Sequence, residues 1–227
     1  MVERILVINP NSNRGVTRAM SEALESFRFA EGPVIDCVDI AEGPAGIESQ
    51  ADADAVAPLV ARAVAADAAD AYVVACFSDP GLYAAREATS APVLGIAQCD
   101  MHAAMALGAS FGIISILQRS IPRHLRYVAS LHLSPRLAGD RAIELTVAEL
   151  AQGPVVLERM AQVGRELIDK DGAEAIVMGC AGMAAYRAAL EERLGVPVID
   201  PTQAAVADAL RLVLTARGKA GEARRSA

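Results

Sequence analysis

The feature of this sequence that most constrains its fold is an internal repeat, in which an apolar segment ends in a cysteine and a turn follows at once. The segment Tyr72–Ala75 ends at Cys76, and the segment Ile176–Gly179 ends at Cys180, 104 residues later. The offset holds for Asp70 with Glu174 and for Ala71 with Ala175, and it becomes 105 for Pro92-Val93 with Pro197-Val198. Such self-similarity predicts two copies of one structural unit, each placing a thiol at the end of a buried strand.

The chain length is consistent with two such units. A chain of 227 residues accommodates two domains of about 100 residues, each with its own core. The repeat places a first lobe at residues 1–98 together with 202–216 and a second lobe at residues 99–201. Residues 217–227 are polar, basic and small, which is typical of a flexible tail.

Strand-like and helix-like segments alternate along the chain. We predict strands over residues 4–8, 33–38, 71–75, 92–96, 111–116, 141–145, 175–178 and 196–199. We predict helices over residues 15–27, 51–68, 81–88, 100–107, 123–131, 155–169, 184–194 and 202–216. The strands are continuous apolar runs, which favours parallel sheets covered on both faces. The predicted fold class is α/β, with two pseudosymmetric Rossmann-like lobes, each a mostly four-stranded parallel sheet flanked by helices, and the active site between the lobes.

Composition and charge argue against several classes of protein. The formal net charge is −7, and no basic stripe precedes the last residues, so we expect no nucleic-acid partner. The chain start does not match a signal peptide, and no run of about 18 apolar residues predicts a membrane span. We therefore expect a cytoplasmic protein whose cysteines are free thiols. Zinc-ligand spacings, a Gly-x-Gly-x-x-Gly motif after a strand and a phosphate-binding loop are all absent, so we expect neither a metal nor a cofactor.

Five polar or thiol side chains follow directly after predicted strands. They are Asn9, Cys76, Gln98, Gln118 and Cys180. Each alone is explained better as a turn residue. Ligands of parallel α/β sheets bind beyond the carboxyl ends of the strands, so the five together predict a small-molecule site where the two lobes face each other.

The two repeated cysteines suggest acid/base chemistry. A single thiol at the end of an apolar strand is more often a small buried hydrophobe, but the duplicated placement favours a function, whereas Cys37 and Cys99 lack a counterpart and are interpreted as structural. A helix that begins just beyond each thiol is expected to favour the thiolate. A thiolate on one face of a carbon and a thiol on the other can racemise it without metal or cofactor, with backbone N–H groups holding the enolate oxygen. The small residues Gly179, Ala181 and Gly182 would let a ligand approach the backbone closely.

The remaining titratable candidates have two interpretations each. His102 lies on a predicted helix and could face the cleft or be exposed and inert, while His124 and His132 are predicted to lie on the surface. Asp79 is either a turn or cap residue or a residue that orients the ligand. The last helix is expected to be capped by Asp200 or Thr202.

Five motifs together resemble the hydantoin racemase family of the aspartate/glutamate racemase superfamily. They are Ile8-Asn9-Pro10-Asn11-Ser12, the segments Ala75–Leu82, Arg119–Pro122 and Gly172–Met183, and Gly195–Asp200. The resemblance implies cofactor-independent racemisation in a cleft between two lobes, with Cys76 and Cys180 as the two acid/base residues. It also implies substrate contacts from Asn9, Asn11 and Ser12, from Phe77 and Ser78, from Ala181 and Gly182, and from Arg119 and Ser120. Asp79, Gln98 and Gly179 complete the predicted set of substrate-binding residues.

The substrate stays open among several alternatives. Many hydantoin racemases carry Asp where Ser78 stands, and allantoin racemases tend to have a small residue there, so we expect a 5-substituted hydantoin or allantoin. The superfamily also contains amino-acid racemases, maleate isomerases and arylmalonate-type decarboxylases; the presence of both cysteines argues against decarboxylation. A non-catalytic binding protein is a further alternative, and an even-numbered homo-oligomer is expected. We expect the turn after Cys76 to shape substrate choice and the turn after Cys180 to provide close backbone approach.

Overall fold

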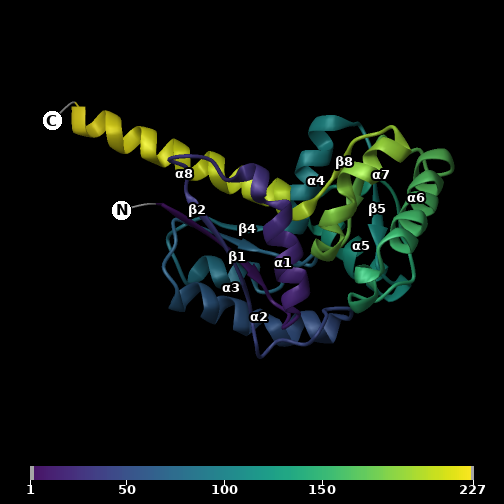
Figure 1. The fold of residues 1–227 in the computed structure, drawn as a ribbon, viewed down its shortest axis with the longest axis horizontal. Coiled ribbons are helices and arrows are strands. Elements are labelled where there is room, and N and C mark those ends of the chain that lie inside the picture. Colours follow the sequence, from purple (N-terminus) through teal and green to yellow (C-terminus); the bar gives the residue numbers. More distant parts are fainter. Residues whose placement is uncertain (1–2, 226–227) are drawn as a thin grey trace.

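Two four-stranded parallel sheets carry the fold in the computed structural model, which describes residues 3–225, with the backbone alone for residues 219–225 (Figure 1). The first sheet has the order β2-β1-β3-β4 and contains β1 (Arg4–Asn9), β2 (Val34–Asp39), β3 (Ala71–Val74) and β4 (Val93–Gly95). The second has the equivalent order β6-β5-β7-β8 and contains β5 (Phe111–Ser115), β6 (Leu137–Ala142), β7 (Ala175–Met178) and β8 (Val198–Ile199). The predicted α/β fold with two similar lobes is confirmed.

Helices flank both sheets (Figure 1). The first lobe carries α1 (Arg14–Ala23), the short 3-10 turn η1 (Glu25–Phe27), α2 (Gln50–Ala66) and α3 (Leu82–Glu87), and α4 (Ile96–Leu107) leads into the second lobe. The second lobe carries η2 (Gln118–Ser120), α5 (Ile121–Ser130), η3 (Ser134–Arg136), η4 (Ala148–Gln152), α6 (Pro154–Asp169), η5 (Ala181–Tyr186) and α7 (Arg187–Leu194). The last helix, α8 (Pro201–Arg225), returns across β3, β1 and β4 and then extends beyond the first lobe.

Backbone hydrogen bonds reproduce the sequence repeat. The amide of Ala75 donates to the carbonyl of Ile8 at 2.8 Å, and the amide of Gly179, 104 residues later, donates to the carbonyl of Ile114 at 2.9 Å. Likewise Tyr72 donates to Pro92 at 2.9 Å, and Ile176 donates to Pro197 at 2.8 Å. The offsets of 104 and 105 therefore describe one strand arrangement built twice.

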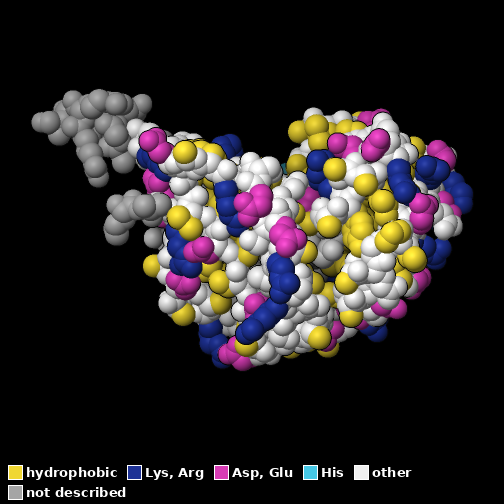
Figure 2. Space-filling model, in the orientation of Figure 1, with side chains coloured by type: hydrophobic (Ala, Val, Ile, Leu, Met, Phe, Trp, Pro, Cys, Tyr) yellow, Lys and Arg dark blue, Asp and Glu magenta, His cyan; other side chains and the backbone are white. Residues whose placement is uncertain are grey.

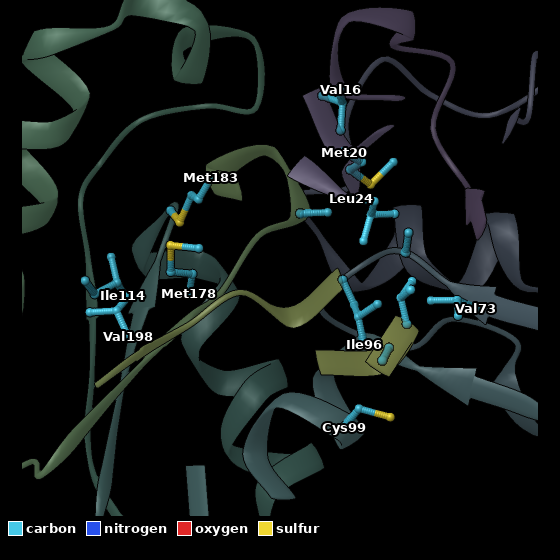
Figure 3. Close-up of a cluster of buried hydrophobic side chains, with 14 of the residues drawn as sticks. Val16, Met20, Leu24, Val73, Ile96, Cys99, Ile114, Met178, Met183 and Val198 are labelled. Atoms are coloured by element: carbon cyan, nitrogen blue, oxygen red, sulfur yellow. The ribbon is translucent and has the colours of Figure 1, made fainter. Parts of the chain in front are cut away.

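A continuous apolar core joins the two lobes. The central strands β3 and β7 are buried at every position, as expected of strands covered on both faces. One cluster of buried side chains runs from Met20, Val73 and Ile96 in the first lobe to Ile114 and Met178 in the second (Figure 3). Because this core is shared and close-packed, it holds the carboxyl ends of the two sheets in a defined relative position.

Several element boundaries differ from the sequence prediction. The strand expected at residues 141–145 is β6 at Leu137–Ala142; as an edge strand it has only partly buried residues, so it lacks the apolar run that marks the inner strands. The first helix ends at Ala23 and continues only as a 3-10 turn. The last helix runs to Arg225 rather than to residue 216, although Gly218 and Gly221 lie in the added stretch. The predicted flexible tail is therefore helical in residues 217–225, and its last two residues lie outside the described part of the chain.

The lobe boundaries at residues 98 and 201 stay predictions. Helix α4 continues across residue 98, and α8 packs both on α4 and on the first sheet. On the face shown in Figure 2, acidic and basic side chains are interspersed over both lobes. Within residues 3–225, no helix is long and apolar enough to cross a membrane.

Candidate active site

The carboxyl ends of the strands in the two sheets border one small pocket. Cys76 follows β3 and Cys180 follows β7, and both residues line this pocket. The other side chains and backbone groups of the lining come from both lobes: Asn11, Val16, Ile47, Ala75, Phe77, Ser78, Ile116, Ser120, Arg123, His124, Val147, Gly179, Ala181 and Gly182. The two sequence repeats thus meet at a single site.

A tight turn presents Cys76. The carbonyl of Cys76 accepts hydrogen bonds from the amides of Ser78 at 2.7 Å and Asp79 at 2.9 Å, and Asp79 has a left-handed backbone with φ of 44°. Gly81 follows with φ of 71°, where an added Cβ would lie 2.4 Å from the carbonyl oxygen of Ala57. The turn therefore needs residues that tolerate positive φ, and glycine is the residue that does so without strain.

A different backbone conformation presents Cys180. The 3-10 helix η5 begins directly after it, and the amide of Gly182 donates to the Cys180 Sγ at 3.4 Å. Gly179 lies so close to β5 that an added Cβ would be 2.7 Å from the carbonyl oxygen of Ile114. Packing against β5 thus leaves no room for a side chain at Gly179.

Burial dominates the ionisation of both thiols. Removal from water raises the pKa of Cys76 to about 12, opposed chiefly by the positive charge of Arg123. The same cause raises the pKa of Cys180 to about 11, opposed by the Gly182 amide. The expectation that helix N-termini favour the thiolates is wrong for the ligand-free protein. Helix α3 begins only at Leu82, and one amide at Cys180 does not offset the loss of solvation.

Helix α5 contributes two pocket residues that the sequence did not identify. Arg123 is 8% exposed, its Nε donates to the Ser78 Oγ at 2.7 Å, and its Nη1 has no partner among the described residues. His124 was predicted to lie on the surface and is instead 2% exposed, with its ring edge against Phe77 at a centroid distance of 5.1 Å. The signal was available in the sequence: Ser120, Arg123, His124 and Tyr127 are spaced to share one face of a helix.

Two buried side chains hold the His124 imidazole by hydrogen bonds to its Nδ1. Its Nδ1 lies 3.0 Å from the Ser115 Oγ and 3.1 Å from the Asp140 Oδ2, and the Ser115 hydroxyl donates to the Asp140 Oδ1. Ser115 ends β5, and Asp140 lies on β6. The second sheet therefore fixes the orientation of this imidazole within the pocket wall.

Five of the predicted substrate-binding residues do not line the pocket. Asn9 is buried beneath it, donates to the Asn11 Oδ1 at 3.0 Å and so supports a residue that does line it. Ser12 is tied through its amide to the carbonyl of Pro44. Gln98 accepts from Arg86, and Arg119 is largely exposed and paired with Glu48. These four residues therefore lie outside the pocket lining, and their contact with a substrate stays a prediction.

Asp79, the fifth, is an anchor of the first turn. Its carboxylate accepts from the amides of Ala97 at 3.0 Å and Gln98 at 2.9 Å and from the Tyr127 hydroxyl at 2.6 Å. It therefore caps α4 and fastens the turn to α5. Burial raises the pKa of Asp79 to about 6 against these hydrogen bonds.

The remaining candidates lie away from the site or at a helix end. His102, His132 and Gln118 are exposed, and Gln118 does not line the pocket. Asp200 caps the last helix, because its Oδ1 accepts from the amide of Gln203 at 2.8 Å. Within the described residues, no three His, Cys, Asp or Glu side chains gather so that they could hold a metal ion.

Comparisons with known proteins point to one family. The family model for Asp/Glu/hydantoin racemases matches residues 5–209 of the chain. The hydantoin racemase of Paenarthrobacter aurescens is 41% identical over 217 residues, which cover 92% of this chain and 91% of that protein. The structure of allantoin racemase from Klebsiella pneumoniae matches with a TM-score of 0.89 at 33% identity, covering 94% of this chain and 89% of that one. A variant of arylmalonate decarboxylase has a TM-score of 0.72 at 19% identity over 93% of each chain, which indicates a shared fold alone.

Proposed function

The chain belongs to the Asp/Glu/hydantoin racemase family, and we propose that it racemises 5-substituted hydantoins by moving protons at C5 between two thiols, Cys76 and Cys180. The racemase class follows from the family; the substrate and the two-thiol mechanism are our proposal. The observation that carries it is the placement of both thiols in the wall of one pocket, each from a different lobe. A planar ring bound between them would have one thiol on each face.

The chemistry needs only two proton transfers. The thiolate of one cysteine takes the proton from C5, and the C5–H electron pair moves into the adjacent C4 carbonyl, whose oxygen becomes the enolate oxygen. The other cysteine then gives its S–H proton to the opposite face of C5, and the enolate electrons return to form the new C–H bond. The cysteines exchange protonation states in each turnover, so the steps balance without any change of oxidation state.

Ionisation of one thiol is the demanding step. Both thiols have a raised pKa in the ligand-free pocket, so the reactive thiolate is a minor species at neutral pH. Hydantoins suit such a site, because C5–H lies between a carbonyl and a nitrogen and is unusually acidic for a carbon acid. A buried thiolate is also strongly basic, since its proton affinity rises with its pKa.

The pocket wall supplies further proposed contacts to the substrate. We propose that Asn11 and Ser120 offer side-chain donors, that Gly179, Ala181 and Gly182 offer backbone groups, and that Phe77 and Ser78 line the wall beside the ring. Hydrogen-bond donors fixed before the reaction can stabilise developing enolate charge without reorganising.

A substrate panel tests the proposal directly. The purified protein is incubated with single enantiomers of 5-substituted hydantoins in deuterated water, and the decay of optical rotation is followed together with deuterium entry at C5. We expect both signals to proceed at comparable rates. If no hydantoin and no allantoin exchanges its proton, the proposal fails, and ligand-induced thermal stabilisation without exchange would favour a binding protein.

Allantoin is the second candidate substrate, favoured by the likeness to allantoin racemase and by the small side chain of Ser78. The same panel distinguishes the two by kcat/KM. Release of carbon dioxide from a disubstituted malonate would instead indicate a decarboxylase.

A further inference from the structure

Two consecutive residues at the start of α5, Arg123 and His124, bring opposite hydrogen-bonding capacities into the pocket wall. Neither is used by the proton transfers between the thiols. Both are almost fully buried, so each needs a reason to keep a polar group at this position.

Arg123 is a buried cation with an unused donor. Its Nε is satisfied by the Ser78 hydroxyl, whereas Nη1 is buried with no hydrogen-bond partner among the described residues. A buried charged donor without an acceptor is costly, and an oxygen atom of a bound molecule would satisfy it. The positive charge of Arg123 also acts on Cys76, where it opposes the rise in the pKa of the thiol. Arg123 is therefore suited to a ligand oxygen that gains negative charge beside Cys76.

Proton counting indicates what His124 offers. The Ser115 hydroxyl has one hydrogen, and it points to the Asp140 carboxylate, so neither partner can donate to the His124 Nδ1. Nδ1 must then carry the hydrogen and donate to both. In the neutral imidazole, Nε2 is left with a lone pair, and it makes no hydrogen bond within the described residues. His124 therefore offers the pocket an acceptor.

We propose that Arg123 and His124 together bind one amide edge of the substrate ring, Arg123 on the C4 carbonyl oxygen and His124 on the adjacent N3–H. This proposal rests on the proposed function. The C4 oxygen is the atom that becomes the enolate oxygen when C5 loses its proton. Arg123 keeps all its protons throughout and stabilises the charge on that oxygen, which makes it a catalytic residue. His124 recognises the ring and sets its orientation between the thiols.

The donor–acceptor pair defines a substrate class. It fits a cyclic amide in which a carbonyl and an N–H lie side by side, as they do in a hydantoin and in the hydantoin ring of allantoin. An open-chain malonate lacks an N–H at that position. The pair thus selects ring ureides over other acids that the shared fold accommodates.

Methylation of the substrate at N3 tests the role of His124 without altering the protein. The N3-methyl derivative keeps the C5 proton and the C4 carbonyl, and its exchange rate in base without enzyme serves as the reference. We expect kcat/KM to fall about tenfold or more for the wild-type protein, because one buried hydrogen bond is lost and an acceptor is left unpaired.

The variant His124→Asn completes a double-mutant cycle. Asparagine can keep the donor to Asp140 and Ser115 but cannot present an acceptor where Nε2 lies, and His132→Asn is the matched control at an exposed histidine. We expect N3-methylation to cost this variant less than about twofold, because the contact is already missing. An undiminished methylation penalty in His124→Asn, or none in the wild type, would overturn the role of His124.

Arg123 is tested by Arg123→Gln and Arg123→Lys, with Arg126→Gln as the control on the same helix. We expect Arg123→Gln to lower kcat about 100-fold with a smaller change in KM, Arg123→Lys to recover part of it, and the control to stay within about twofold. A change confined to KM would overturn the catalytic role.

The alkylation rate of Cys76 can be measured without any turnover of substrate, so it tests Arg123 independently of the proposed function. In Arg123→Gln, alkylation of Cys76 by iodoacetamide at about pH 8, followed by peptide mass spectrometry, should slow several-fold relative to Cys180. An unchanged ratio would show that Arg123 does not act on Cys76. If the wild type racemises hydantoins and the variants behave as their controls, only the inference fails. If the wild type racemises nothing while the alkylation ratio shifts, the proposed function fails and Arg123 keeps its effect on the thiol.

Discussion

The turn after Cys76 packs against α5 of the second lobe, whereas the turn after Cys180 packs against α1 of the first lobe. Helix α1 follows β1 as α5 follows β5, so the exchange of contacts is part of the internal symmetry. The chemistry differs. Ser78 and Asp79 accept hydrogen bonds from Arg123 and Tyr127 of α5, while Val16 of α1 offers η5 an apolar side chain.

This difference suggests how a duplicated unit can give two unequal bases. The repeat preserves the geometry that places the thiols in one pocket, and the contacts from the opposite lobe determine what each thiol experiences. Cys76 has a cation in its surroundings and Cys180 has a single amide. We infer that the two halves have different roles. The Cys76 side stabilises negative charge on the substrate, and the Cys180 side lets the substrate approach the backbone closely.

The largest expected effect comes from removing either thiol. Cys76→Ala and Cys180→Ala should each lower racemisation by about 1000-fold or more, because general acid or base catalysis on one face is lost. Optical rotation and C5 deuterium exchange are measured for both enantiomers, since a remaining thiol can still exchange the proton on its own face. Cys37→Ala, at a partly buried cysteine of β2, is the control. Full activity of one thiol variant would remove the two-base assignment.

Activity should also rise steeply with pH. With thiol pKa values of about 11 and about 12 in the free protein, the thiolate fraction grows about tenfold per pH unit between about pH 7 and 9, and kcat/KM should follow it. A plateau already at pH 7 would mean that a thiolate exists before substrate binds.

Stability limits this measurement at high pH. A thiol whose pKa is higher in the folded than in the unfolded state stays protonated longer when folded. The unfolded chain therefore loses protons first, and the free energy of unfolding falls as the pH rises above about 9. Unfolding curves at each pH identify the range in which the rate profile reports chemistry alone.

The fold and the two thiols could be predicted because their causes are local. The apolar runs, the repeat offset and the turn residues after Cys76 and Cys180 are all read within short segments. Arg123 and His124 were missed because their burial depends on the other lobe covering α5, a tertiary contact with no local signature except the polar face of that helix. The edge strand β6 was misplaced for another reason, because a strand with only one neighbour is partly buried and lacks a continuous apolar run. The sequence therefore predicted the two thiols but not Arg123, whose charge acts on Cys76.

Exchanging the residues before the two cysteines compares their backbone environments. Gly179 and Ala75 occupy equivalent positions, but a Cβ on Gly179 would lie 2.7 Å from the carbonyl oxygen of Ile114. We expect Gly179→Ala to lower the free energy of unfolding by about 1–3 kcal/mol and to reduce activity by displacing Cys180. Ala75→Gly should cost about 1 kcal/mol or less. Urea unfolding measures both, and equal costs would show that the two positions tolerate a Cβ alike.

The smallest expected effect concerns the carboxyl groups behind the two turns. Asp79 caps α4 and Asp200 caps α8, and burial raises the pKa of each to about 6. Asp100 is fully buried with neither oxygen hydrogen-bonded among the described residues, and burial together with the charges of Asp200 and Asp79 holds its pKa well above the ordinary range. The charges of Asp79 and Asp200 thus act on the carboxyl group of Asp100.

These three carboxyl groups change the free energy of unfolding with pH in a direction that is unusual for carboxyl groups. Between their unfolded pKa near 4 and their higher folded pKa, these groups bind more protons in the folded state, so the free energy of unfolding falls as the pH rises from about 4 to 7. Carboxyls with lowered pKa, such as Asp67 and Asp171, act oppositely and lose their contribution only at lower pH. Asp100→Asn removes one of the three titrations and should flatten the decline, with a gain of about 1 kcal/mol at pH 7. Wild type and variant are unfolded thermally and in urea at pH 5 and 7, and an equal pH dependence of the two would mean that Asp100 binds no more protons in the folded than in the unfolded chain, leaving Asp79 and Asp200 as the groups that couple the two turns to pH.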